Sequence, residues 1–177
     1  MSDGIFLPKL GRGTLLPASE RAARLAEALP QILAAVEGER DEIALEATLA
    51  CLLWESLSQT NWCGFYRRVA EEELAVGPYQ GGMGCLRISF KRGVCGACAR
   101  TGTPQLVPDV NEFPGHIACD DATRSELVLP VLNRAGRLIA VLDLDCAKPD
   151  GFCEEEADLL QALLQKTFGA LGTGIGH

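Results

Sequence analysis

The stretch ELVLPVLNRAGRLIAVLDLD, residues 126–145, decides the fold. It contains two apolar runs separated by the short polar turn 134–136, and this pattern is typical of a β-hairpin. A second strand pair is predicted at 61–69 and 73–81, on either side of an acidic turn at 71–73. Strands joined as hairpins pair antiparallel, so the two hairpins predict an antiparallel sheet at the centre of the chain.

Segments whose apolar residues recur at helical spacing lie on both sides of this region in the sequence. A first helix is expected from Ser19, with Pro30 kinking or breaking it and Gly38 ending it. Two more helices, each with an acidic first turn, are expected at 41–57 and 154–168. The helices therefore occupy the two ends of the chain and can pack together on one face of the sheet.

The segment between the hairpins carries shorter elements. Residues 85–90 are expected to be extended, 92–101 to form a glycine turn that opens a short helix, and 103–110 to contain a short strand. The loops between roughly residues 80 and 126 are free to cover the second face of the sheet, which is where function is expected.

These elements predict an α+β class with one domain. The domain should span residues 18–170, with an N-terminal arm at 1–17 and a flexible, glycine-rich tail at 171–177. No internal repeat or linker divides the 177 residues.

The amino-acid composition limits the classes of molecule that the chain is expected to bind. Hydrophobic residues make up 47% of the chain, and the net charge is −8. An acidic chain without a basic stripe cannot neutralise phosphates, so nucleic acid and anionic membranes are excluded as expected partners. The N-terminus shows no basic leader followed by an apolar run, and no apolar stretch reaches membrane length. A cytoplasmic location is expected.

Eight cysteines are many for a cytoplasmic chain, and three interpretations compete. The motif C-x-x-C at Cys95 and Cys98 is typical of thioredoxin-like redox sites, but its flanks predict hairpins rather than parallel crossovers. A zinc site could combine these two residues with Cys63, Cys85 or Cys119, yet the chain has no second C-x-x-C motif. Neither pattern is a strong signal.

The third interpretation is a disulfide relay in turn-rich loops. Cys85 follows GGMG, Cys95 follows RGV, and Cys119 follows HIA. A thiol in a mobile loop can approach a partner sulfur, as a relay requires, because one thiolate attacks and a second thiol resolves the product. Three buried loop cysteines without chemistry remain the alternative.

Six motifs, in order, resemble the free methionine-R-sulfoxide reductases, a family of stand-alone GAF-domain enzymes. The resemblance covers roughly residues 40–168, and the motifs are NWCGFY at 61–66, GPYQGGMGCLRI at 77–88, RGVCG at 92–96, VPDVNEFPGHIACD at 107–120, SELVLPV at 125–131 and AVLDLD at 140–145. It implies a GAF-like fold, in which a central antiparallel sheet carries the helices of both chain ends on one face and a loop-covered ligand pocket on the other.

The resemblance also implies roles for individual residues. Cys119 matches the catalytic cysteine, and Cys95 and Cys85 match the resolving pair, with their order left open. The pocket side chains that it implies are three carboxylates and two aromatic rings: Glu126, Asp143, Asp145, Trp62 and Tyr66. His116 either lowers the pKa of the Cys119 thiol or holds the loop, and both interpretations stay open.

Sulfoxide chemistry explains why such residues are needed. The sulfur is electrophilic only when its oxygen can take a proton, so the site needs an acid beside a thiolate. Clustered carboxylates repel one another, and one of them, for which Glu126 is favoured, should stay protonated as donor. The remaining carboxylates can bind the substrate ammonium group, and the backbone N–H groups of Gly93 and Val94 can hold its carboxylate.

The resemblance therefore implies reduction of free L-methionine (R)-S-oxide through a sulfenic acid and an intramolecular disulfide, with thioredoxin as reductant. No cofactor and no metal is expected. Whether the chain forms a homodimer stays open. The alternative is a GAF-type module that senses a small ligand without catalysis.

Overall fold

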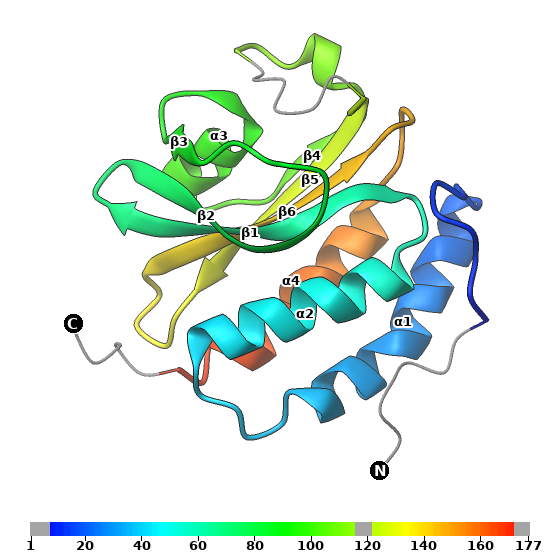
Figure 1. Ribbon diagram of the computed structural model, residues 1–177, viewed down its shortest axis with the longest axis horizontal. Helices are drawn as coiled ribbons and strands as arrows, with labels where there is room; N and C mark the ends of the chain where they lie inside the picture. The colour runs from blue at the N-terminus through cyan, green and yellow to red at the C-terminus, as the bar shows by residue number, and fades with distance from the viewer. Residues whose placement is uncertain (1–7, 116–121, 172–177) are drawn as a thin grey trace.

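The computed structural model describes residues 8–115 and 122–171. An antiparallel sheet of six strands lies at its centre, in the order β3-β2-β1-β6-β5-β4 (Figure 1). The strands are β1 (Thr60–Ala70), β2 (Glu73–Gly81), β3 (Arg87–Ser89), β4 (Gln105–Val107), β5 (Ser125–Leu132) and β6 (Leu138–Cys146). The helices are α1 (Ala18–Ala35), α2 (Glu42–Ser56), α3 (Gly93–Thr101) and α4 (Glu154–Phe168), with a 3₁₀ turn at Val110–Glu112. The predicted α+β class is confirmed.

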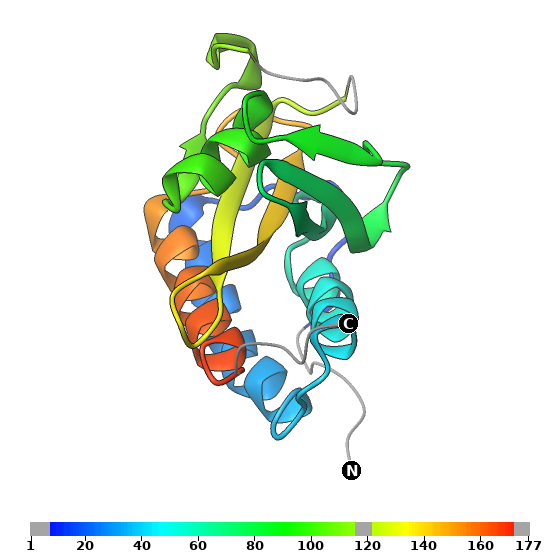
Figure 2. The same cartoon turned by 90° about the vertical axis from the view of Figure 1, so that its left-hand side faces the viewer.

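The long helices and the short helix lie on opposite faces of the sheet. Helix α2 packs on β1 and β2, α4 packs on β5, and α1 packs against both helices as an outer layer. Helix α3 contacts β5 and β6 from the other side (Figures 1 and 2). The sheet therefore has one face filled by helices and a second face on which a loop-covered site can form, as expected.

Side-chain alternation along the central strands sorts the residues between these two faces, because successive side chains point to opposite sides of a strand. The helix-facing core takes the even-numbered leucines of β6, Leu142 and Leu144, together with Phe65 of β1. Trp62 and Tyr66 belong to the second core, which lies under α3. This alternation sends the carboxylates at odd-numbered positions of β6 to the α3 face.

The helix boundaries have local causes. The Asp41 side chain accepts a hydrogen bond from the Ala44 N–H at 2.8 Å and caps α2. Helix α4 begins with three glutamates, and Glu156 reaches back to accept the Cys153 N–H at 3.0 Å. Both starts coincide with the acidic first turns that the sequence indicates.

One expectation about the helices is wrong in part. Pro30 does not break α1, which continues to Ala35 because Ala28 and Ile32, on either side of the proline, are buried against the other helices. Cys51 is exposed on α2. In the expected extended segment 85–90, only Arg87–Ser89 pairs as a strand.

The described part of the arm, residues 8–17, contains no helix or strand before α1. It is held by Arg12, whose guanidinium lies 3.8 Å from the centre of the Trp54 ring and donates to the Leu57 carbonyl at 2.8 Å. Residues 1–7, and 172–177 of the expected tail, lie outside the described residues.

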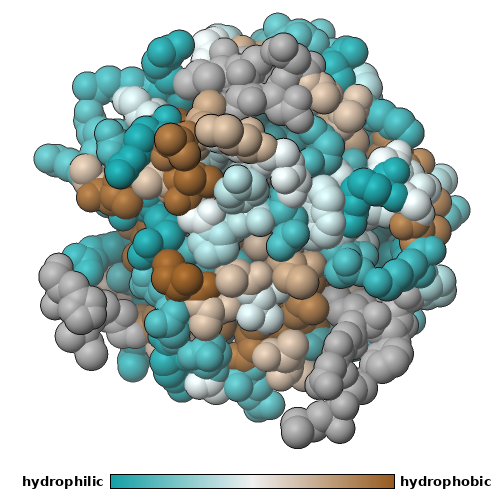
Figure 3. Space-filling view, in the orientation of Figure 1, coloured by the Kyte–Doolittle hydropathy of each residue, from teal (hydrophilic) through white to brown (hydrophobic). Residues whose placement is uncertain are grey.

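The surface seen in the orientation of Figure 1 is mixed, with several separate apolar patches among hydrophilic residues (Figure 3). Among the described residues, none of the helices combines the length and the hydropathy that crossing a membrane requires. Apolar patches of this scattered kind are normal on a protein surface.

Candidate active site

Three adjacent strands bring the predicted pocket residues together on the α3 face. Trp62 of β1 and Glu126 of β5 are both register partners of Asp145 on β6, which lies between them. Two residues earlier on β6, and on the same face, Asp143 lies opposite Gly64 and Val128. The sheet register, rather than any local motif, therefore assembles the acid cluster beside the aromatic residues.

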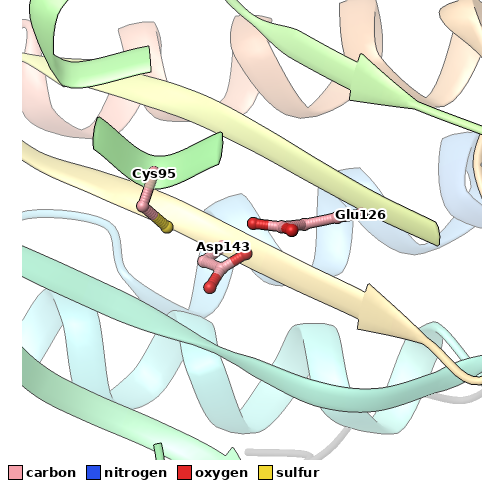
Figure 4. Close-up of side chains that lie close together, drawn as sticks. All are labelled: Cys95, Glu126 and Asp143. Atoms are coloured by element: carbon pink, nitrogen blue, oxygen red, sulfur yellow. The ribbon is translucent and has the colours of Figure 1, made fainter. Parts of the chain in front are cut away.

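Cys95, Glu126 and Asp143 form the centre of this cluster. One ligand atom of each, the Cys95 sulfur and a carboxylate oxygen of the other two, lies within 4.8 Å of the others (Figure 4). All three residues are buried, with 4%, 6% and 6% of their surface exposed. Asp143 Oδ1 is buried without a hydrogen-bond partner in the described structure. The cluster thus keeps one acceptor oxygen unused.

Burial and mutual repulsion determine the charge of the two acids. Burial raises the pKa of Glu126 well above its ordinary value, and the charges of Asp143 and Asp145 raise it further. Burial also raises the pKa of Asp143, to about 7, although hydrogen bonds from Cys95, Glu126 and the Leu144 N–H oppose the shift. Glu126 is consequently the protonated member, and it donates its hydrogen bond to Asp143.

The Cys95 thiol is neutral in this environment. Burial raises its pKa well above the ordinary value, and the charges of Asp143 and Glu126 add to the shift. The thiol donates a hydrogen bond to the Asp143 carboxylate, which stabilises the protonated form. Cys95 is therefore poorly placed to act as a thiolate nucleophile in this arrangement.

The loop between β2 and β3 covers the aromatic side of the cluster. The Trp62 ring stacks between Tyr66 and Tyr79, with centroid distances of 5.4 and 5.2 Å. Trp62 Nε1 donates to the Gly82 carbonyl at 3.1 Å. A Cβ at Gly84 would lie 2.7 Å from the Tyr66 hydroxyl, so only glycine allows the loop to approach this closely.

Cys85 lies in the same loop, is half-buried and is part of a disulfide. Its backbone N–H hydrogen-bonds to the Tyr66 hydroxyl. The six other cysteines that the structure describes carry free thiols: Cys51, Cys63, Cys95, Cys98, Cys146 and Cys153. A disulfide-bonded cysteine therefore packs beside the aromatic wall formed by Trp62 and Tyr66.

Comparison with known proteins adds to this geometry. The model of the GAF domain family matches residues 41–167. A free methionine-R-sulfoxide reductase of Saccharomyces cerevisiae is 40% identical over 147 residues, covering 77% of this chain and 82% of the yeast protein. A protein of the same name from Escherichia coli is 39% identical over 140 residues, covering 79% and 84%.

The chain belongs to the GAF-domain family of free methionine-R-sulfoxide reductases. The structure of a free methionine-R-sulfoxide reductase from Neisseria meningitidis, in complex with its substrate, superposes with a TM-score of 0.79 at 40% identity. It covers 88% of this chain and 95% of its own. The GAF fold and an oxidoreductase enzyme class follow for this chain.

The other predicted site residues of this member of the free methionine-R-sulfoxide reductase family lie around the cluster. Asp145 is half-buried, which places it nearer the surface than Asp143. Val94 is buried at the start of α3. The Gly93 N–H, by contrast, already donates to the Gly115 carbonyl at 3.1 Å. The Gly93 N–H is engaged in this arrangement, and its binding of the substrate carboxylate together with Val94 stays a prediction.

Cys119, His116 and Asp121 lie outside the described residues. Their flanks do not: the Gly115 carbonyl contacts the first residue of α3, and the Arg124 N–H donates to the Cys146 carbonyl at 2.8 Å. Arg124 also pairs with Asp109 at 3.1 Å. The described residues on the two sides of that segment therefore lie beside the start of α3 and just before the start of β5.

Sequence reasoning missed two features of this reductase site. The hydrogen bond from Cys95 to Asp143 joins α3 to β6, and no local sequence pattern predicts it. The close approach of Gly84 to Tyr66 has a signal in the motif GGMG, although the partner cannot be read from it. Cys98, the second cysteine of the C-x-x-C motif, is buried and lies outside the Cys95–Glu126–Asp143 group.

Proposed function

We propose that this chain reduces free L-methionine (R)-S-oxide to methionine. The observation that carries the proposal is the protonated Glu126 held against Asp143 beside the stacked Trp62 and Tyr66. The activity named for the yeast and Escherichia coli relatives supports it, as does the substrate complex of the Neisseria meningitidis protein.

Different side chains of the site bind different groups of the substrate. Glu126 donates its proton to the sulfoxide oxygen, which makes the sulfur electrophilic. The carboxylates of Asp143 and Asp145 bind the ammonium group, and the unused Asp143 Oδ1 offers an acceptor for one of its N–H bonds. The methyl group packs against the aromatic rings of Trp62 and Tyr66.

The redox step belongs to Cys119. Its thiolate attacks the sulfur, methionine leaves, and the oxygen stays on the cysteine as a sulfenic acid. A second thiol condenses with this sulfenic acid, forming a disulfide and releasing water. A dithiol such as thioredoxin then reduces the disulfide and is itself oxidised.

We assign the resolving step to Cys85 rather than Cys95. Cys85 is half-buried and disulfide-bonded, whereas Cys95 is a buried, free thiol committed to Asp143. Cys119 is the proposed partner of Cys85, because the chain has eight cysteines and six others are free. It lies four residues beyond Gly115, so the extended chain allows it at most about 14 Å of reach from the start of α3.

Turnover tests the proposal. NADPH oxidation, coupled through thioredoxin reductase and thioredoxin, should be seen with the R epimer of free methionine sulfoxide and should exceed that with the S epimer. Cys119→Ser should lower turnover by at least about 10³-fold, because the nucleophile is lost. Cys98→Ser is the matched control and should retain activity.

Full activity in Cys119→Ser would refute the assignment of the nucleophile. Binding of methionine sulfoxide by the wild-type protein without any turnover would favour the sensor function instead. The cytoplasmic location stays a prediction, and whether the chain forms a homodimer stays open.

A further inference from the structure

The buried cluster that contains the proton donor Glu126 also has the ligand atoms of a metal site. A thiol and two carboxylates present one ligand atom each within 4.8 Å of one another, from α3, β5 and β6. Figure 4 shows Cys95 and Glu126 pointing toward the same space, with Asp143 beside them. Three protein ligands from three rigid elements are the number that open zinc sites use.

A second observation is independent of this proximity. Asp143 is 6% exposed, and its Oδ1 atom is buried without a hydrogen-bond partner in the described structure. A buried, unpaired carboxylate oxygen is costly unless a cation or donor reaches it. The half-buried Asp145, on the same face of β6, extends the acidic cluster outward.

We propose that Cys95, Glu126 and Asp143 bind one zinc-class divalent cation while Cys95 is a free thiol. The mixed set of one sulfur and two oxygens selects the class of ion. A thiolate ligand favours Zn²⁺, whereas Mg²⁺ and Ca²⁺ prefer all-oxygen sites. This set of one cysteine and two carboxylates also explains why the zinc pattern sought in the sequence, based on Cys95 and Cys98, does not find this site.

Binding changes the protonation of the cluster. The Cys95 thiol and the Glu126 carboxyl both carry protons in the free site, and a metal ligand must be deprotonated. Each bound ion should therefore release about two protons near neutral pH. The Asp143–Glu126 and Asp143–Cys95 hydrogen bonds are replaced by bonds to the metal.

The site overlaps the one proposed for methionine sulfoxide. Resting on that proposed function, the bound ion removes the proton donor and occupies the place of the ammonium group. Zinc should then act as an inhibitor that competes with the substrate. Binding of the metal itself does not depend on the reaction, so the two proposals can fail separately.

Metal titration of the full chain, without reductant and with the Cys85 disulfide intact, tests the site. Zn²⁺ binding is measured with a competing chromophoric chelator, and one equivalent should bind per chain and withstand a thousandfold excess of Mg²⁺. Cys95→Ser should weaken binding at least about tenfold. Cys98→Ser, a buried neighbour on the same helix, and Cys51→Ser, the exposed thiol on α2, should bind as the wild type does.

Co²⁺ provides a readout that needs no variant. Replacement of Zn²⁺ by Co²⁺ in the wild-type protein should produce a sulfur-to-metal charge-transfer band in the near ultraviolet, and Asp143→Asn should weaken Co²⁺ binding. Absence of this band, absence of a stoichiometric Zn²⁺ site, or loss of binding in Cys51→Ser instead of Cys95→Ser would each overturn the proposal.

Discussion

Two buried glutamates show how differently the same residue type behaves on the two faces of the sheet. Glu126 faces other acids and keeps its proton, which suits a donor. Glu46 of α2 lies 3.6 Å from Arg67, but its buried Oε2 atom makes no hydrogen bond in the described structure. Burial raises the pKa of Glu46 to about 8 against the partial compensation from Arg67. Glu126 is therefore expected to act as a proton donor, and Glu46 is expected to lower the free energy of unfolding at alkaline pH.

Glu126→Gln should lower kcat by about 10²- to 10⁴-fold, because the amide cannot protonate the sulfoxide oxygen. In the wild type, turnover should fall as the pH rises past the raised pKa of Glu126, and this alkaline limb should vanish in the variant. The pH profile of kcat with free methionine-R-sulfoxide measures both effects. Glu112→Gln, an exposed glutamate, is the control; equal losses in both variants would contradict the role of Glu126.

Glu46→Gln should flatten the pH dependence of stability. The folded-state pKa of about 8 lies above the ordinary glutamate pKa of 4.5, so the folded protein binds the proton more tightly. The corresponding stability is fully present below pH 4.5 and is lost as the pH rises through about 8, at up to about 1.4 kcal/mol per pH unit.

Urea unfolding at pH 6 and pH 9 measures this effect. The wild type should lose more free energy of unfolding between the two values than Glu46→Gln does. An identical loss in both proteins would show that Glu46 is ionised at neutral pH despite its burial.

At the scale of the elements, one buried ion pair fixes the outer helix to the rest of the fold. The Arg21 Nε atom of α1 donates to both carboxylate oxygens of Glu156 on α4, each at 3.2 Å. Gln59, just before β1, donates to the same carboxylate at 3.0 Å. A single side chain thus joins two helices and the start of a central strand.

Glu156→Ala should therefore destabilise the fold by about 3–5 kcal/mol, because it leaves the Arg21 charge buried without a partner. Its exposed neighbour Glu155→Ala should change the free energy of unfolding by less than about 0.5 kcal/mol. Urea unfolding of the two variants checks the difference. Equal stability would mean that α1 is held by apolar packing alone.

The loop between β2 and β3 offers a second matched comparison. A Cβ at Gly84 would meet the Tyr66 hydroxyl at 2.7 Å, whereas a Cβ at Gly82 meets nothing within 4 Å. Gly84→Ala should displace the loop from the aromatic wall and raise KM for methionine sulfoxide several-fold, with a change in tryptophan fluorescence. Gly82→Ala should change neither, and similar KM values for both variants would exclude a role of the loop in binding.

For the whole molecule, local pattern and long-range pairing contribute different parts of the prediction. The hairpin at 126–145 and the amphipathic helices follow from the sequence because their periods are local. The continuity of α1 through Pro30 does not, because packing from α2 and α4 overrides the local preference. The side on which Asp143 and Asp145 lie follows from strand alternation.

The finer geometry of the site depends on contacts between distant segments. Two hydrogen bonds depend on the position of α3 on the sheet. One joins Cys95 to Asp143, and the other joins the Gly93 N–H to the Gly115 carbonyl. The resemblance supplied the roles of Cys85, Cys95 and Cys119, and spacing alone left them open. The disulfide of Cys85 and the free thiol of Cys95 now favour one order of events over the other.

A single-turnover experiment tests the central claim most directly. Fully reduced protein, freed of reductant, is mixed with one equivalent of free methionine-(R)-S-oxide, and the products are analysed by mass spectrometry with disulfide mapping. We expect one methionine per chain and a new disulfide between Cys85 and Cys119, with Cys95 still a free thiol. Formation of no methionine, or a disulfide that excludes Cys119, would contradict the account.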